Sequence, residues 1–190
     1  MGKGRLEAFS DGVIAIIITI MVLELKVPHG VEFEALKELG PVFLSYVLSF
    51  VFVGIYWNNH HHLFHAVKTV SAGILWSNLH LLFWLSLLPF TTGWMGENHF
   101  ASLPVATYGL NVLLCAIAYT ILLRSIIATQ GKDSAFAKAV GKDRKGIISL
   151  ICYVLAIPLA FYLPLASGVL FAVVSLIWFI PDRRMEKAIN

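Results

Sequence analysis

The chain has 190 residues, of which 58% are hydrophobic and 13% are charged, and its formal net charge is +3. Soluble globular domains carry about 25% charged residues, so this composition excludes an ordinary water-soluble domain. A membrane helix needs about 20 apolar residues to cross about 30 Å of hydrocarbon, so the chain can hold at most about six crossings with short loops. We therefore expect a single multi-pass membrane domain over residues 1–190.

Hydrophobic segments follow one another along the whole sequence, and they predict an all-α integral membrane protein with six transmembrane helices. The last apolar stretch, from Ile147 to Ile180, contains Pro158 and Pro164 and is too long for one membrane helix. We therefore divide it into a tight hairpin of two short spans that turns near Leu163. The predicted spans are residues 6–27, 41–60, 71–93, 103–127, 147–163 and 165–180.

The distribution of lysine and arginine among the loops predicts the orientation. Cytoplasmic loops of membrane proteins collect basic residues. With six spans and both termini in the cytoplasm, twelve of the fourteen basic residues lie inside, and only Lys26 and Lys37 lie outside. A chain with five spans would place Arg183, Arg184 and Lys187 on the far side. The bias therefore favours six spans with both termini cytoplasmic.

The first span opens with a run of polar side chains. Residues 5–11, Arg-Leu-Glu-Ala-Phe-Ser-Asp, place two acids, a base and a hydroxyl in the first two turns of an otherwise aliphatic helix. An ionisable group within a membrane span is unfavourable unless it faces protein or water, so Asp11 marks a candidate site. The alternative is a helix cap in the headgroup region, with Ser10 or Asp11 accepting from free backbone amides. The acids also interrupt the pattern of a secretory signal, so we expect this span to be retained.

A narrow stripe of side chains runs along the same span. At 100° per residue its members fall within about 60° of one another, with Ile20 at the edge and Asp11 about 120° from the centre. If several copies of the helix surrounded an axis, the stripe would form an aliphatic gate and a hydroxyl ring able to replace part of an ion's hydration shell. Ordinary helix packing explains the stripe too, and the residues alone favour packing. The stripe consists of Arg5, Gly12, Ile16, Thr19 and Leu23.

A second polar cluster lies at the inner ends of spans two and three. Residues 57–65, Trp-Asn-Asn-His-His-His-Leu-Phe-His, end span two, and residues 77–80, Ser-Asn-Leu-His, lie about two turns into span three. His61 and His65 share a helix face, a spacing that suits a metal ion, so a metal-dependent membrane enzyme using the cluster from His60 to His65 is one alternative. Because acidic ligands and further histidine boxes are missing, we favour an interhelical hydrogen-bond network and expect no bound metal.

A proton-coupled carrier is a further alternative. Asp11 and His80 are expected at a similar depth near the inner side, and an acid and an imidazole together can relay protons. Carriers usually show internal repeats or broken helices around a site at the membrane midplane, and the sequence displays neither feature. The carrier therefore ranks below the other interpretations.

The motif Arg5-x-x-x-Phe9-Ser10-Asp11, at the start of the first span, resembles the signature of the bacterial relatives of transmembrane protein 175, the endosomal and lysosomal potassium channel. The Trp-Asn-x-His run that ends span two and the Asn-x-His of span three are similar as well, and the likeness extends over the whole chain. The resemblance implies a homotetrameric, potassium-permeable channel of the cell membrane with a non-classical potassium channel fold. It implies no cofactor and no catalytic residue, and its expected partners are lipid and monovalent cations, not nucleic acid.

The resemblance also implies roles for individual residues. In that family the first helices line the pore, and the hydrophobic constriction corresponds here to Ile16, Ile20 and Leu23, while Thr19 is associated with potassium preference. On this basis we prefer the pore over ordinary packing for the stripe. The motif is held in a polar network with spans two and three, in which we expect Asp11 and His80 to fix the tilt of the first helix. The expected network residues are Arg5, Phe9, Ser10, Asp11, Trp57, His61, Asn78 and His80.

Acidic residues follow the first span on the predicted outer side. Carboxylates near a pore mouth raise the local concentration of cations, and salt screens this effect. We expect them to attract permeant ions. They are Glu24, Glu32, Glu34 and Glu38.

Overall fold

The computed structural model describes residues 2–65, 67–131, 133–141 and 143–179. Over these residues every regular element is an α-helix, as expected for the predicted all-α fold. Ile180, the predicted end of the last span, and the basic residues Arg183, Arg184 and Lys187 lie outside the described residues. The helices are α1 (Lys3–Leu23), α2 (Phe33–Glu38), α3 (Gly40–His65), α4 (Ala72–Ser86), α5 (Leu88–Glu97), α6 (Ser102–Gln130), α7 (Ala135–Val140), α8 (Arg144–Leu159) and α9 (Pro164–Phe179).

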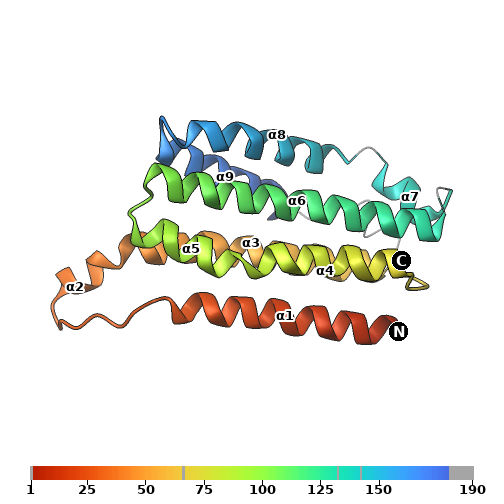
Figure 1. Cartoon of the computed structure of the whole chain (residues 1–190), viewed down its shortest axis with the longest axis horizontal. Coiled ribbons are helices and arrows are strands. Elements are labelled where there is room, and N and C mark those ends of the chain that lie inside the picture. Colours follow the sequence, from red (N-terminus) through yellow and green to blue (C-terminus); the bar gives the residue numbers. More distant parts are fainter. Residues whose placement is uncertain (1, 66, 132, 142, 180–190) are drawn as a thin grey trace.

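The long helices run side by side, and the connections between them lie at two opposite ends of the bundle (Figure 1). The start of α1, the connection from α3 to α4 and the short helix α7 lie at one end, which we call the α7 end. The short helix α2, the connection from α5 to α6 and the turn between α8 and α9 lie at the other end, the α2 end. The predicted cytoplasmic loops among the described residues thus share the α7 end, and the predicted outer loops share the α2 end.

Four stretches of the described chain are long and apolar enough to cross a membrane. They are α1, α3, α4 taken together with α5, and α6, and they coincide with the first four predicted spans. Several of their boundaries differ from the prediction, the largest differences being that α1 ends at Leu23 instead of residue 27, that α3 continues to His65 instead of residue 60 and that α5 continues to Glu97 instead of residue 93. The segments predicted as the final hairpin form α8 and α9, which have 16 residues each.

The hairpin of α8 and α9 turns over residues 160–163, between two prolines. Pro158 lies in the last turn of α8, and Pro164 begins α9, where its missing N–H would have no helical partner in any case. The Ser167 hydroxyl donates to the Ala156 carbonyl at 2.8 Å, which joins the two helices just below the turn. The tight hairpin predicted from the prolines is therefore present.

The third predicted span, residues 71–93, is present, and its helix is interrupted at Leu87 between α4 and α5, a break that the sequence-based prediction did not include. Pro89 explains the break, because proline has no backbone N–H and its ring collides with the carbonyl of the fourth residue before it. The Leu87 N–H instead donates to the Trp84 carbonyl at 3.3 Å, which is the tighter spacing found at helix ends.

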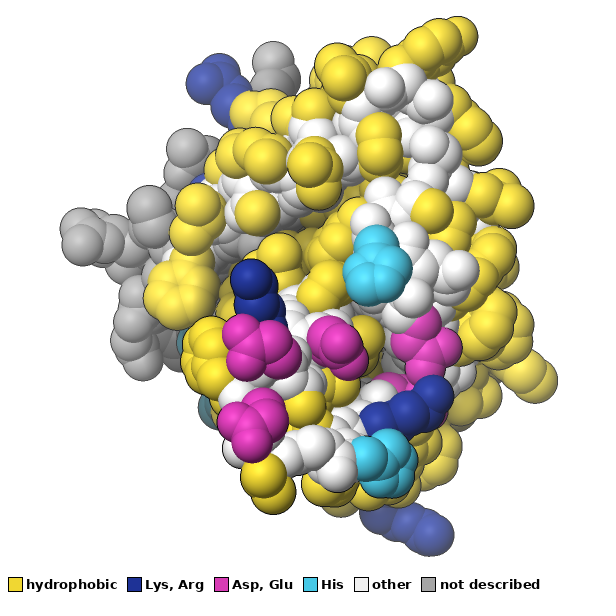
Figure 2. Space-filling model, turned by 90° about the vertical axis from the view of Figure 1, so that its left-hand side faces the viewer, with side chains coloured by type: hydrophobic (Ala, Val, Ile, Leu, Met, Phe, Trp, Pro, Cys, Tyr) yellow, Lys and Arg dark blue, Asp and Glu magenta, His cyan; other side chains and the backbone are white. Residues whose placement is uncertain are grey.

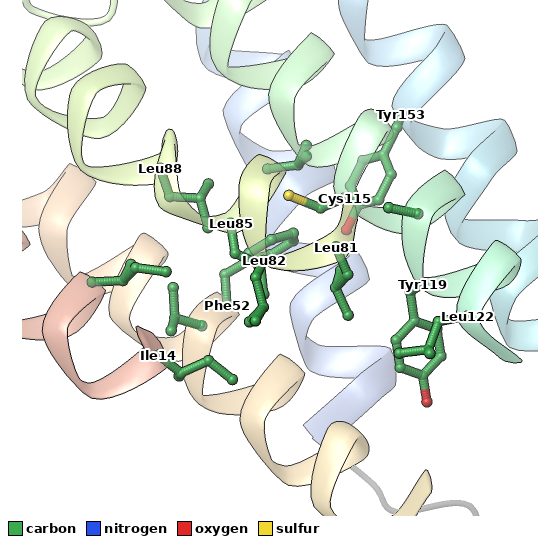
Figure 3. Packing of buried hydrophobic residues seen from close by; sticks show 14 of the residues in the cluster. Ile14, Phe52, Leu81, Leu82, Leu85, Leu88, Cys115, Tyr119, Leu122 and Tyr153 are labelled. Atoms are coloured by element: carbon green, nitrogen blue, oxygen red, sulfur yellow. The ribbon is translucent and has the colours of Figure 1, made fainter. Parts of the chain in front are cut away.

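An apolar core joins the helices. Figure 3 shows part of this cluster, in which side chains of α1, α3, α4, α6 and α8 surround one another. Leu81 and Leu85 of α4 and Leu122 of α6 are fully buried, so α4 and α6 lie at the centre of the bundle. Cys115 is buried in the same cluster and Cys152 lies at its margin, and both are free thiols.

Helix α1 lies at the edge of the bundle (Figure 1). It packs against α3, α4 and α5. Its buried side chains recur every three or four residues and form one face of the helix, as an amphipathic packing pattern requires. The remaining circumference of α1 is uncovered in the single chain. The buried face consists of Leu6, Ser10, Ile14, Ile17 and Met21.

Candidate functional site

The uncovered side of α1 carries the stripe found in the sequence. At 100° per residue, the centre of the stripe lies about 150° from the centre of the buried face. Ile14 and Ile17 are 1% and 2% exposed, whereas Ile16 is 58% exposed. Arg5, Gly12, Thr19, Ile20 and Leu23 are exposed as well. The stripe is thus the side of α1 that is available to another chain, to lipid or to water.

The hydroxyl of Thr19 is oriented by its own helix. It donates to the Ile16 carbonyl at 2.8 Å, so its proton is already bound within the preceding turn. A hydroxyl oxygen has two lone pairs beside its proton, and these remain available to accept. Because Thr19 is exposed, its oxygen can serve as a ligand for a cation outside the helix.

A chain of buried hydrogen bonds joins α1 to α4 and α3 near the α7 end. The Asn78 amide donates from Nδ2 to the Ser10 hydroxyl at 2.9 Å, and the Ser10 hydroxyl donates to the Leu6 carbonyl at 2.8 Å. The Asn78 amide oxygen lies 2.8 Å from Nε2 of His60, so this ring nitrogen carries the proton and donates. Ser10, Asn78 and His60 are all buried, which makes this chain a specific contact between three helices.

A second, exposed contact ties α1 to α3. The Trp57 indole donates from Nε1 to the Asp11 carboxylate at 3.1 Å. The Trp57 ring stacks on His61 one turn further along α3, with ring centroids 6.2 Å apart. Asp11 is therefore held as a hydrogen-bond acceptor, although it lies on the flank of α1 and not on its buried face.

Neither expected network histidine, His61 or His80, belongs to the buried chain of hydrogen bonds, and His61 reaches the network only by stacking on Trp57. His61 is exposed and contacts His65, and His80 is exposed and accepts a hydrogen bond from the Trp84 indole at 2.9 Å. Among the described residues, Asp11 is bonded by Trp57, and the hydrogen bonds include none between Asp11 and His80. The remaining motif residues, Arg5 and Phe9, are exposed on α1.

The histidine that does reach the buried chain, His60, was not among the expected network residues. It lies on the face of α3 that also buries Val53 and Phe64, whereas His61 is rotated by about 100° away from that face. The sequence contained a usable signal, because the histidine of the Trp-Asn-x-His run is His60 itself. Neighbouring histidines on a helix point in different directions, and only one of them can face α4.

Charged side chains gather at the α2 end, next to the end of α1. Figure 2 shows this end, with acidic side chains beside basic and histidine side chains. The ammonium of Lys26 and the carboxylate of Glu97 are 2.7 Å apart, and this ion pair raises the pKa of Lys26 above its ordinary value. The acids expected to attract cations are exposed here. They are Glu24, Glu32, Glu34 and Glu38.

Comparisons with known proteins agree on one family. The family model described as endosomal/lysosomal potassium channel TMEM175 matches residues 5–89, which extend from the motif on α1 to the start of α5. A potassium channel of Chryseobacterium sp. (strain P1-3) is 57% identical over 190 residues, covering 100% of this chain and 99% of that protein. The endosomal/lysosomal proton channel TMEM175 of Gallus gallus is 45% identical over 76 residues, 34% of this chain and 15% of that protein.

A solved structure has a similar fold. The crystal structure of a lysosomal potassium-selective channel TMEM175 homologue from Chamaesiphon minutus superposes with a TM-score of 0.82 at 28% sequence identity. The superposition covers 95% of this chain and 97% of that one. The likeness therefore includes α8 and α9, which the family model does not reach.

Proposed function

Because the chain belongs to the TMEM175 family of potassium channels, we propose that it conducts potassium ions across a membrane through a pore lined by α1. Its relatives are channels and not enzymes. One observation carries the assignment of the pore: the stripe of α1 is turned away from the buried face, so it is free to face an axis. The family resemblance inferred from the motif is confirmed by the match to residues 5–89 and by the relative with 57% identity.

We infer that the channel is a homotetramer in the cell membrane. One chain offers one exposed α1 stripe, and a closed ring of stripes requires several copies related by rotation. The neighbour of known structure supports an oligomeric channel. Each chain would be a single domain of residues 1–190 with six spans, in which α8 and α9 form the last two, and with both termini in the cytoplasm. Helices of 16 residues are about 24 Å long, so this hairpin requires a locally thin bilayer.

The proposed constriction consists of Ile16, Ile20 and Leu23. Rings of aliphatic side chains exclude water from a narrow pore, and an ion cannot pass where its hydration shell is lost without replacement. The exposure of all three side chains in the single chain supports this role, because they are not needed for packing within the protomer. Movement of α1 that widens the rings would admit water and open the path.

Thr19 is the proposed contact for the dehydrated ion. Its proton is bound to the Ile16 carbonyl, so a ring of Thr19 side chains would present oxygen lone pairs to the axis. A single hydroxyl ring replaces fewer water molecules than the stacked carbonyl rings of the Thr-Val-Gly-Tyr-Gly filter, which this sequence lacks. We therefore expect a modest preference for potassium over sodium.

The polar network would set the tilt and rotation of α1. Ser10, through Asn78 and His60, fixes the inner part of the helix from its buried side, and Asp11 fixes it from the flank through Trp57. Because α1 has only one packed face, these contacts decide which side chains reach the axis. His61 and His80 remain candidates for contacts between subunits, since both are exposed in the single chain.

Recording from single channels in planar bilayers tests the function. We expect unitary potassium currents from the purified protein, and currents too small to resolve, with saturable flux, would favour the proton-coupled carrier. Metal analysis of the purified protein distinguishes the channel from a metal-dependent enzyme. The enzyme requires tightly bound iron or zinc in stoichiometric amount. The channel assignment predicts that His60, His61, His62 and His65 hold no such resident metal.

A further inference from the structure

Two exposed histidines at the end of α3 lie in direct contact. His61 and His65 are four residues apart, so they share a face of the helix, and their Nε2 atoms are 3.1 Å apart. The two rings are nearly perpendicular, with an interplanar angle of 76° and centroids 4.6 Å apart. Both side chains are exposed at the α7 end, and the pore proposed above does not involve the contact between them.

The geometry of the pair matches that of two ligands of one metal ion. Zinc binds imidazole nitrogen at about 2.0–2.1 Å in tetrahedral sites, which places two ligand nitrogens about 3.3 Å apart. The distance between the Nε2 atoms of His61 and His65 needs to increase by only a few tenths of an ångström to reach this value. At present one Nε2 donates to the other, and a shift of that proton to Nδ1 of the same neutral ring frees both Nε2 atoms for a metal.

We propose that His61 and His65 form an exchangeable binding site for a late first-row divalent cation such as Zn²⁺ at the α7 end of the channel. Imidazole nitrogen is a preferred ligand for zinc, nickel and copper ions, and hard cations such as Mg²⁺ and Ca²⁺ prefer oxygen. The remaining coordination positions would be filled by water. The ligand is a reversibly bound ion, not a resident cofactor.

The surroundings explain why only two histidines take part. His60 is buried and its Nε2 is bonded to Asn78, so it cannot bind a metal on the exposed face. His62 follows His61 directly and is rotated by about 100°, and its ring lies 5.8 Å from that of His61. Over the residues that the structure describes, no group of three or more His, Cys, Asp or Glu side chains is placed to hold a metal. Two protein ligands give weaker binding than the three or four of a catalytic or structural zinc site.

The pair lies beside both exposed contacts between α3 and the start of α1. His61 stacks on Trp57, whose indole is bonded to Asp11, and the Lys3 ammonium donates to the His65 carbonyl at 3.3 Å. A cation bound to both rings would hold the His61 ring against Trp57. The Lys3 ammonium is partly neutralised by Glu7, at 3.9 Å, which limits its repulsion of a metal ion.

Zinc titration of the full-length protein in detergent, after treatment with a chelator and its removal, tests the site. Calorimetry or equilibrium dialysis should give one Zn²⁺ per chain, and His65→Ala should weaken the affinity at least tenfold. His62→Ala is the matched control, because it removes a neighbouring imidazole outside the pair and should leave the affinity unchanged. His65→Cys should restore zinc binding, since a thiolate replaces the lost ligand.

Equal zinc affinity in the wild type and in His65→Ala, or an equal loss in His62→Ala, would overturn the proposal. Undiminished Zn²⁺ binding in the presence of excess Mg²⁺ supports it, and displacement of Zn²⁺ by Mg²⁺ contradicts it. If His65→Ala does not elute as the wild type does, His65→Gln replaces it under the same criterion. The binding measurement does not depend on conduction, so its failure would leave the channel proposal standing.

Discussion

The two faces of α1 carry the same kind of residue in opposite environments. Ile14 and Ile17 are buried against the neighbouring helices, whereas Ile16, which lies between them in sequence, is largely exposed. Hydropathy cannot separate these isoleucines, because in a membrane protein both lipid-facing and protein-facing positions are apolar. Ser10 is bonded on the buried face and Asp11 on the flank, so these hydrogen bonds are the contacts proposed to fix the rotation of the helix. One face of α1 thus packs against the bundle, and the other carries the proposed pore stripe.

The sharpest test of this comparison replaces adjacent residues of the same type. Ile16→Asn should raise potassium flux into vesicles severalfold or more, because a polar ring admits water into the constriction. Ile17→Asn should instead lower the free energy of unfolding by about 2–4 kcal/mol, because it removes a packed side chain and buries an amide. Flux assays and thermal unfolding in detergent measure the two effects. Unchanged flux in Ile16→Asn would refute the gate, and Val22→Asn, exposed but off the stripe, is its control.

The buried chain of hydrogen bonds should give the next largest effect, on the free energy of unfolding. Asn78→Ala removes the acceptor of the buried His60 ring and the donor to the Ser10 hydroxyl, which still donates to the Leu6 carbonyl, and an unsatisfied buried polar group costs about 1–3 kcal/mol. We expect a corresponding fall in the free energy of unfolding of the purified protein. Asn98→Ala is the control, since Asn98 is exposed and bonds only to the Trp94 carbonyl of its own helix. Equal thermal unfolding of the two variants would show that the buried hydrogen bonds do not hold α1.

The exposed contact between Asp11 and Trp57 should contribute less. Trp57→Phe keeps an aromatic ring beside His61 but removes the N–H that donates to the carboxylate, a hydrogen bond of about 1–2 kcal/mol. We expect a small loss of thermal stability together with a measurable change in flux, because the tilt of α1 is less restrained. Wild-type stability and flux in this variant would show that the contact between Asp11 and Trp57 does not hold α1. The buried hydrogen bonds alone would then set the tilt of the helix.

A substitution at Thr19 tests the proposed pore-lining face of α1 without affecting its packed face. Thr19→Ala removes the hydroxyl oxygen and should shift the reversal potential under bi-ionic potassium and sodium conditions, which corresponds to a few-fold change in permeability ratio. Because Thr19 bonds only within its own turn, stability should change little. Thr107→Ala, a similar exchange of a hydroxyl that bonds within α6, provides the control. An unchanged reversal potential in Thr19→Ala would contradict the role in selectivity.

The smallest effect is expected at the ion pair of Lys26 and Glu97. Exposed ion pairs contribute little and are screened by salt, so Glu97→Gln should leave thermal unfolding nearly unchanged. Because Glu97 raises the pKa of Lys26, the contribution of the pair is fully present below the ordinary lysine value of 10.5 and is lost as the pH rises through the raised pKa. A change of pH within the neutral range should therefore not alter the contribution of the ion pair. A strong dependence of stability on this residue at pH 6–8 would contradict the assignment of stability to the buried face of α1.

Much of the fold could be predicted from local signals. The apolar segments gave the membrane class and the first four spans, and Pro158 and Pro164 gave the final hairpin. The break at Leu87 was missed even though Pro89 lies two residues beyond it, because mean hydropathy does not register a single missing N–H. The motif on α1 identified the family, which the comparisons confirm.

The contacts of the site could be predicted only in part. Asp11, Trp57, Ser10 and Asn78 were named as members of one network, but their pairing was not known, and His60, which bonds Asn78, was not named. The sequence offered the family resemblance and a shared depth in the membrane, and neither gives the pairing of side chains. Depth does not distinguish Trp57 from His80 as the partner of Asp11, since the two lie on different helices and the rotation of each helix was unknown.

The sequence by itself determined that this is a membrane protein. It also determined the periodicity of each helix and the stripe on α1, because these are properties of single segments. The tertiary structure decided which face of α1 is buried, which histidine meets Asn78 and which two histidines touch each other. Those outcomes depend on the relative rotation and offset of packed helices, which small differences in side-chain fit and hydrogen bonding select. A one-dimensional pattern offers candidates for such contacts, and only packing in three dimensions chooses among them.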